Sequence, residues 1–147
     1  MPVRLTRAVL TEVIRAAQRE LLIVGFAAYR VQAVVDALRA AANRGVRIRL
    51  ILETAEDSGG TLTIDASHAF AAIRQQVEFY VWPIEQRPRL PSGVARLHAK
   101  GAIADDHTAL VTCANITEYA IAENMELGVL IRGGPVPPAG SPNTSTN

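Results

Sequence analysis

The 147-residue sequence has little cysteine, little lysine and no long apolar run. Its one cysteine, Cys113, excludes an intramolecular disulfide and a cysteine-rich zinc site, which favours a reducing, cytoplasmic setting. No apolar run approaches the roughly 20 residues that cross a bilayer, and the N-terminal residues lack a signal-peptide pattern, so we expect no membrane partner. The net charge of +1 gives no global attraction to nucleic acid, so any anion site must be local.

The first half of the chain alternates helical and strand patterns. Apolar residues recur at helical spacing over 5–19 and 31–41, and Gly45 is placed to cap the second helix. Nearly continuous apolar runs over 21–27, 46–52 and 77–82 predict buried strands. This order predicts an α/β fold with a mixed, largely parallel sheet flanked by helices.

The second half is predicted to hold a helix over 66–76, an extended proline-containing loop after residue 82 and a β-hairpin. The hairpin strands cover 97–104 and 108–114 and turn at Asp105-Asp106. A short helix from Ile116 and a last strand over 125–131 follow. The residues from Gly133 onward have nothing to bury. We therefore expect one domain over 1–132 and a disordered tail over 133–147.

Lys100 is the only lysine of the chain, and it follows His98 by two residues among small or apolar neighbours. Residues i and i+2 of a strand share a face, so both polar side chains are predicted to point the same way. Burying them without partners would cost free energy, so we expect them to face a cleft. A neutral imidazole beside a compact ammonium suits attack on a phosphoryl group. An isolated histidine–x–lysine pair is more often a coincidence on a surface hairpin.

The pair lies in a longer pattern, however. His98, Lys100 and Asp105 form H-x-K-x4-D, and "TCAN" at 112–115 and the sequence Asn124-x-Glu126 follow it. This set resembles the HKD motif of the phospholipase D superfamily. The upstream segment that contains "RAAANRGVRIRLILE" also looks like the family's first half, so the resemblance covers roughly residues 5–131.

The resemblance implies a catalytic role for each matched residue. His98 would be the nucleophile that forms a phosphohistidine, Lys100 and Asn115 would hold the phosphate oxygens, and Glu126 would orient the imidazole. Asp105 belongs to the motif, with a role that is more often structural. The family's chemistry implies no metal and no cofactor.

Thr112-Cys113 stands where the family has Gly-Ser, so Cys113 takes a phosphate-binding position with a weaker donor than a hydroxyl. Two other interpretations of Cys113 are open. It could be a nucleophile, although nothing nearby in the sequence is arranged as its base. The preferred interpretation is a small buried hydrophobic residue.

The chain holds one copy of the motif, whereas the family's active site uses two histidines, one that attacks and one that protonates the leaving group. His68 and His107 have no lysine two residues on. The resemblance therefore implies a homodimer whose two His98 residues meet at a two-fold axis, as in the family's small single-motif endonucleases.

Two longer phrases, over 12–53 and 98–134, resemble the phospholipase D-like protein of the bacterial DISARM anti-phage system. That resemblance implies a role in anti-phage defence and other defence-system proteins as partners.

The substrate is the least constrained feature. The basic residues Arg87, Arg89 and Arg96 precede the motif with no acidic residue from 87 to 100, which is typical of a solvated loop or of a rim that follows a nucleic-acid backbone. Three aromatic residues could stack bases, although such residues are more often core: Tyr29, Tyr80 and Trp82. We favour a nuclease. A catalytically weak or inactive nucleic-acid-binding or scaffold module is the alternative, and lipid-headgroup hydrolysis ranks last.

Overall fold

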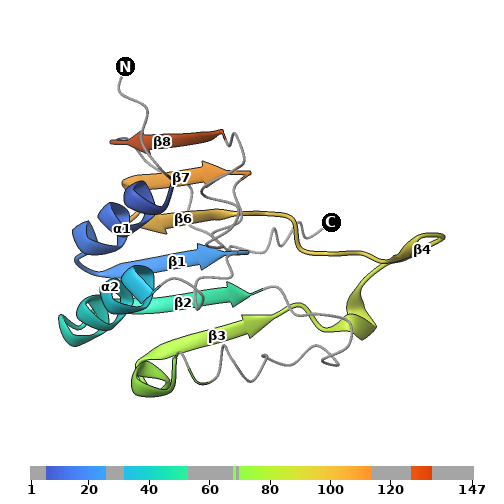
Figure 1. The fold of residues 1–147 in the computed structure, drawn as a ribbon, viewed down its shortest axis with the longest axis horizontal. Coiled ribbons are helices and arrows are strands. Elements are labelled where there is room, and N and C mark those ends of the chain that lie inside the picture. Colours follow the sequence, from blue (N-terminus) through green and yellow to red (C-terminus); the bar gives the residue numbers. More distant parts are fainter. Residues whose placement is uncertain (1–5, 26–31, 53–67, 69, 114–126, 134–147) are drawn as a thin grey trace, which may run out of the picture.

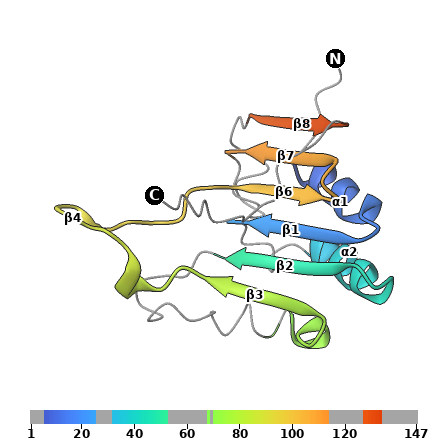
Figure 2. The ribbon, with the colours of Figure 1, turned by 180° about the vertical axis from the view of Figure 1, so that it is seen from behind.

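Two helices lie across one face of a six-stranded mixed sheet in the computed structural model (Figures 1 and 2). The structure describes residues 6–25, 32–52, 68, 70–113 and 127–133. Its elements are α1 (Thr6–Ala16), β1 (Glu20–Val24), α2 (Gln32–Asn43), β2 (Arg47–Leu52), η3 (Ala71–Ile73), β3 (Val77–Val81), η4 (Ile84–Gln86), β4 (Arg89–Leu90), β5 (Gly93–Val94), β6 (Gly101–Ala104), β7 (Thr108–Thr112) and β8 (Gly128–Arg132).

The sheet has the order β3-β2-β1-β6-β7-β8. β1 pairs in parallel with β2, and β2 with β3, whereas β6, β7 and β8 pair antiparallel with their neighbours. It follows that β1, β2, β3 and β7 run one way and that β6 and β8 run the other. The predicted α/β class with a mixed, largely parallel sheet is confirmed.

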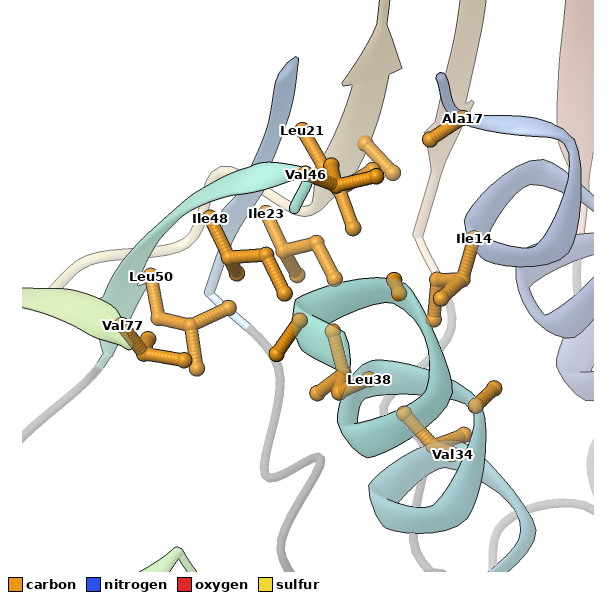
Figure 3. Close-up of a cluster of buried hydrophobic side chains, with 14 of the residues drawn as sticks. Ile14, Ala17, Leu21, Ile23, Val34, Leu38, Val46, Ile48, Leu50 and Val77 are labelled. Atoms are coloured by element: carbon orange, nitrogen blue, oxygen red, sulfur yellow. The ribbon is translucent and has the colours of Figure 1, made fainter. Parts of the chain in front are cut away.

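The core lies between the helices and the sheet face that they cover (Figure 3). Alternate residues of the central strands point to this face, among them Leu21 and Ile23 of β1 and Ile48 and Leu50 of β2, and each of these is fully buried. The helices contribute residues at the predicted helical spacing: Leu10, Val13, Ile14, Val34, Leu38 and Ala41. Truncating one of these large side chains to alanine would cost about 2 to 5 kcal/mol.

The ends of α1 and α2 are tied together. Val46 N–H donates to the Ala41 carbonyl and Gly45 N–H to the Ala42 carbonyl, with Gly45 at φ +85°. This is a Schellman motif, and it confirms the prediction that Gly45 caps the second helix. The Arg44 guanidinium then donates to three carbonyls at the end of α1, those of Ile14, Arg15 and Ala17. A cation at a helix C-terminus also stabilises the helix dipole.

Three local predictions differ from the structure. Of the helix expected over 66–76, the described residues show His68 in helical conformation and then the 3-10 turn Ala71–Ile73, at which Phe70 and Ile73 are buried. The proline-containing loop holds η4 and the two-stranded β4–β5 sheet. The strand expected over 97–104 begins at Gly101. The helix predicted from Ile116 lies outside the described residues, and so does the tail predicted over 133–147 except for Gly133, whose N–H donates to the His107 carbonyl at 2.9 Å.

Among the described helices, none has the length and apolar character needed to cross a membrane.

Candidate active site

Three of the predicted site residues, His98, Lys100 and Cys113, lie at one edge of the sheet, where β1 and β7 end and where β6 and β8 begin. Thr112 N–H donates to the Lys100 carbonyl at 3.1 Å, which extends the β6–β7 ladder by one residue toward His98. At the same edge, Cys113 N–H donates to the Leu127 carbonyl at 3.2 Å. The topology therefore brings the histidine–lysine segment beside the end of β7, where Cys113 in turn contacts Leu127.

His98 and Lys100 lie in the stretch between β5 and β6. His98 is exposed and Lys100 is half-buried, so neither side chain pays the full cost of burial. The Lys100 ammonium donates to the His98 carbonyl oxygen with Nζ 3.1 Å from it. The only lysine of the chain is thus held beside the histidine that the motif predicts as nucleophile.

Gly25 is a site-forming residue that the sequence reasoning missed. A Cβ built at Gly25 would lie 1.8 Å from the Ala99 carbonyl oxygen and 3.3 Å from Lys100 Cγ, and the backbone has φ +74°. Only glycine allows this approach, which presses the end of β1 against the segment from His98 to Lys100. The available signal was a glycine directly after the apolar run "LLIV".

Asp105 lies at the opposite end of β6. It is five positions after Lys100, which corresponds to about 16 Å along a strand. Its carboxylate accepts the backbone N–H groups of Gln18 and Arg19 at 2.8 Å and of Glu20 at 3.0 Å. Asp105 therefore holds the α1–β1 connection and lies away from His98.

The Asp105-Asp106 turn joins β6 to β7, as the sequence predicts. Both residues have positive φ, 53° and 59°, and His107 N–H donates to the Ala104 carbonyl. These are the features of a type I′ hairpin turn. Partial burial by itself would raise the pKa of the Asp105 carboxyl, but the N–H donors of Glu20, Gln18 and Arg19 outweigh it and lower the pKa below its usual value.

Cys113 is exposed, so the preferred interpretation of a small buried hydrophobic residue is wrong. Its sulfur lies 3.3 Å from both the backbone nitrogen and the carbonyl oxygen of Leu127. The preceding Thr112 is buried and donates its hydroxyl to the same carbonyl at 3.3 Å. The core ends at Thr112 because the side chains alternate between the two faces of β7.

Asn115, Asn124 and Glu126 lie outside the described residues, and their roles remain predictions. Within the described part of the chain, no three or more histidine, cysteine, aspartate or glutamate side chains come together in a way that could hold a metal ion.

The three arginines of the predicted rim differ in their surroundings. Arg89 and Arg96 are exposed, whereas Arg87 is only 5% exposed and its guanidinium donates to the Trp82 carbonyl. In this conformation Arg87 faces its own loop, and the exposed positive charge of the rim comes from the other two.

The aromatic candidates for base stacking also differ. Tyr80 is 47% exposed, and its hydroxyl donates to Glu78, which also accepts from Arg47. The hydrogen bond to Glu78 raises the pKa of Tyr80 above its usual value. Trp82 lies under the Arg87 guanidinium, and Tyr29 lies outside the described residues.

Comparison with known proteins identifies related sequences. Residues 10–136 match the family model described as "Cardiolipin synthase, PLD-like domain". Cardiolipin synthase B from Shigella flexneri is 36% identical over 118 residues, and that from Escherichia coli (strain K12) is 35% identical over the same length. Each alignment covers 78% of this chain and 25% of the relative, so the chain spans about a quarter of the length of these curated relatives.

Solved structures share the fold at lower identity. Nuc, a phospholipase D family member from Salmonella typhimurium, is similar with a TM-score of 0.61 and 21% identity over 86% of this chain and 75% of that chain. NucT from Helicobacter pylori has a TM-score of 0.68 and 15% identity over 86% and 76%. TrmBL2, an archaeal chromatin protein described with a novel mode of DNA binding, has a TM-score of 0.56 and 18% identity over 89% and 45%.

Proposed function

The chain belongs to the family of PLD-like domains, and from this premise we propose that it is a metal-independent phosphodiesterase, a nuclease that acts through a phosphohistidine at a homodimer interface. The observation that carries the proposal is the placement of His98 and Lys100. Both lie at the sheet edge beside the ends of β1 and β7, with the ammonium 3.1 Å from the His98 carbonyl oxygen. The proposed nucleophile and the positive charge of Lys100 therefore belong to one short segment at this edge.

The proposed reaction has two steps that balance. A ring nitrogen of His98 attacks phosphorus and the bond to the leaving oxygen breaks, while His98 of the partner subunit gives its proton to that oxygen. Water then attacks the phosphohistidine, the partner's histidine takes the water's proton, and His98 is released. The Lys100 ammonium stabilises the charge that grows on the non-bridging phosphate oxygens. In this proposal Asn115 shares that role, and Glu126 orients the imidazole.

Nucleic acid is the proposed substrate because exposed arginines precede the site. Arg89 and Arg96 are exposed in the segment that leads to His98. Arginine on a surface binds the regularly spaced phosphates of a nucleic-acid backbone.

The decisive experiment measures cleavage of single-stranded and double-stranded DNA in excess EDTA by the wild type and by His98→Ala. We expect chelator-resistant cleavage by the wild type and a loss of about 10³-fold or more in the variant, because the nucleophile is gone. Thermal unfolding of the variant should match the wild type, since His98 is exposed. Equal cleavage by both proteins would contradict the proposed mechanism.

A second candidate function is a nucleic-acid-binding or scaffold module of an anti-phage defence complex, with weak or no catalysis. The observation that favours it is Cys113, whose sulfur contacts the backbone of Leu127 at the position where the family has a hydroxyl. This candidate predicts DNA binding that persists in His98→Ala and no turnover by the wild type.

Lipid-headgroup hydrolysis is tested in parallel because the curated relatives are called cardiolipin synthase B. Release of headgroup from phosphatidylcholine vesicles, lost in His98→Ala and faster than DNA cleavage, would replace nucleic acid as the proposed substrate.

A further inference from the structure

Arg87 and Arg89 are two residues apart in the sequence and have opposite surroundings. Arg89 is exposed, while Arg87 is 5% exposed. The Arg87 Nε donates to the Trp82 carbonyl oxygen at 2.9 Å, Nη2 donates to the same oxygen, and Cζ lies 5.6 Å from the centre of the Trp82 ring. A planar guanidinium makes two hydrogen bonds and a ring contact at once, which an ammonium cannot do.

These contacts close the loop that follows β3. Trp82 comes directly after β3, and Arg87 comes directly after the 3-10 turn η4. Within the loop, Gln86 N–H donates to the Pro83 carbonyl and Arg87 N–H to the Ile84 carbonyl, both at 3.1 Å. The contact between Arg87 and Trp82 is therefore a clamp that fixes where the chain leaves β3.

The segment beyond the clamp is a two-stranded arm that comprises residues 88–96. In the arm, Arg89 pairs with Val94 and Leu90 with Gly93, and Ala95 N–H donates to the Pro88 carbonyl at 3.0 Å. The arm extends away from the helices and beyond the sheet edge at which β1, β2 and β3 end (Figures 1 and 2). An isolated two-stranded hairpin is marginally stable in water, so the direction of the arm depends on its base.

The arm carries positive charge toward the candidate active site. Arg89 and Arg96 are exposed, and Arg96 is two positions before His98, a span of at most about 7 Å. No acidic residue occurs from 87 to 100. The charge of the arm therefore suits a polyanion.

We propose that Arg87 is a positioning residue: it holds the arm in this direction so that Arg89 and Arg96 bind phosphates of a nucleic-acid chain on its way to His98. Arg87 itself binds no phosphate. The proposal rests on the proposed function for its substrate class, and it adds the surface that binds the substrate and the residue that fixes it.

The test measures the binding of a fluorescein-labelled single-stranded oligonucleotide by anisotropy over a range of salt concentrations, in a His98→Ala background that prevents turnover. The double variant Arg89→Gln/Arg96→Gln should bind about tenfold more weakly. Its salt slope should fall by about 1.4, which is about 0.7 for each lost phosphate contact. Arg87→Gln should reproduce most of both changes although its side chain is buried. Added to the double variant, it should change little further, because the arm has already lost its phosphate contacts.

Arg87→Lys is the matched variant if Arg87→Gln does not fold. It keeps the charge and the stem but cannot make two hydrogen bonds to one carbonyl, and we expect the same fall in salt slope. A purely structural role of Arg87 would lower thermal stability and leave the salt slope of the folded protein unchanged, which would overturn the proposal. A change of oligomeric mass in the arm variants, with unchanged oligonucleotide affinity, would overturn it in favour of a contact with a second copy.

The proposed function is tested separately by hydrolysis of bis(p-nitrophenyl) phosphate by the protein with and without His98→Ala. If hydrolysis requires His98 but the arm variants do not change oligonucleotide binding, the phosphodiesterase proposal is supported and the proposed role of the arm is overturned. If the arginine variants change oligonucleotide binding as expected but the protein does not hydrolyse the diester, the proposed role of the arm is supported and the catalytic proposal is overturned.

Discussion

The two ends of β6 carry parts of one sequence motif and are built in opposite ways. At one end, the Asp105 carboxylate accepts three backbone N–H groups from the α1–β1 connection. At the other end, the His98 side chain is exposed and the Lys100 ammonium donates to a carbonyl two residues away. A motif that is continuous in sequence thus combines a structural residue with the candidate chemical residues about one strand length apart.

The active-site end is fixed through its backbone. Gly25 lets the end of β1 approach Ala99, and Thr112 N–H donates to the Lys100 carbonyl. These contacts hold the position of the main chain and leave the imidazole exposed to a ligand. The Asp105 end is instead fixed through a side chain, so the two ends should respond differently to substitution.

The largest effect is expected from Gly25→Ala, with Gly45→Ala as its matched control. Both glycines have positive φ, +74° and +85°, so each substitution costs about 1 kcal/mol of backbone strain. A Cβ at Gly45 meets nothing within 4 Å, whereas one at Gly25 meets the Ala99 carbonyl oxygen at 1.8 Å. We expect Gly25→Ala to cost about 3 to 4 kcal/mol in total and most of the activity.

Urea unfolding and diester hydrolysis measure this pair of variants. Equal stability and equal activity of the two alanine variants would show that the end of β1 does not fix the histidine–lysine segment.

Lys100→Arg is expected to lower kcat/KM about 100-fold, which is about 2.7 kcal/mol of transition-state stabilisation. The charge is kept, but a planar fork replaces a compact ammonium on a side chain whose Cγ packs near Gly25. Stability should change by less than about 0.5 kcal/mol, because the side chain is at the open edge. Hydrolysis assays and thermal unfolding of the same variant measure these two effects. Full activity of Lys100→Arg would contradict the explanation that the site requires the compact ammonium of a lysine.

Asp105→Asn is expected to lower the free energy of unfolding by about 2 kcal/mol, with a much smaller effect on activity than Lys100→Arg. Asparagine tolerates the left-handed backbone at φ 53°, so the loss reports on the carboxylate alone. Asp106→Asn is the control, because its backbone has φ 59° and its carboxylate is not the acceptor of the Gln18, Arg19 and Glu20 N–H groups. Chemical denaturation should separate the two variants; equal losses would assign the effect to the turn.

The smallest effect is the pH dependence of the stability difference between the wild type and Asp105→Asn. The pKa of Asp105 is lowered in the folded protein, so its contribution is complete above the pKa of an unfolded aspartate, about 4, and is lost as the pH falls through the lower folded value. The stability gap between the wild type and Asp105→Asn should therefore narrow below about pH 4. A gap that stays constant between pH 7 and pH 3 would contradict this linkage.

Much of the framework could be predicted from the sequence, because burial leaves a periodic pattern. The spacing of Leu10, Val13 and Ile14 predicts α1, and Gly45 predicts the end of α2. The apolar runs predict β1, β2 and β3, and Asp105-Asp106 predicts the hairpin turn. These patterns depend on neighbours that are close in the chain.

The predictions that differ concern residues whose surroundings are set by specific backbone contacts or short irregular segments, which leave no periodic pattern in the sequence. Cys113 is exposed at an edge that only the pairing of β7 with β8 creates. Arg87 and Arg89 look alike in the sequence, and the Trp82 carbonyl separates them by engaging one guanidinium. The arm escaped prediction because its strands are two residues long and lie among prolines, which leaves no alternating pattern to detect.

The sequence by itself determined the α/β class, the order of the main helices and strands, the turn at Asp105-Asp106 and the choice of His98 and Lys100 as candidate chemical residues. Local propensity, hydrophobic periodicity and short spacings are sufficient for the fold class, the elements and the turn, whereas the choice of His98 and Lys100 depends on the resemblance of the longer pattern to the HKD motif. Only the tertiary structure decided that Asp105 holds the α1–β1 connection, that Gly25 forms the site and that Arg87 is a clamp while Arg89 is exposed. Each of these depends on hydrogen bonds or close contacts that exist only once the folded chain brings separate backbone segments together.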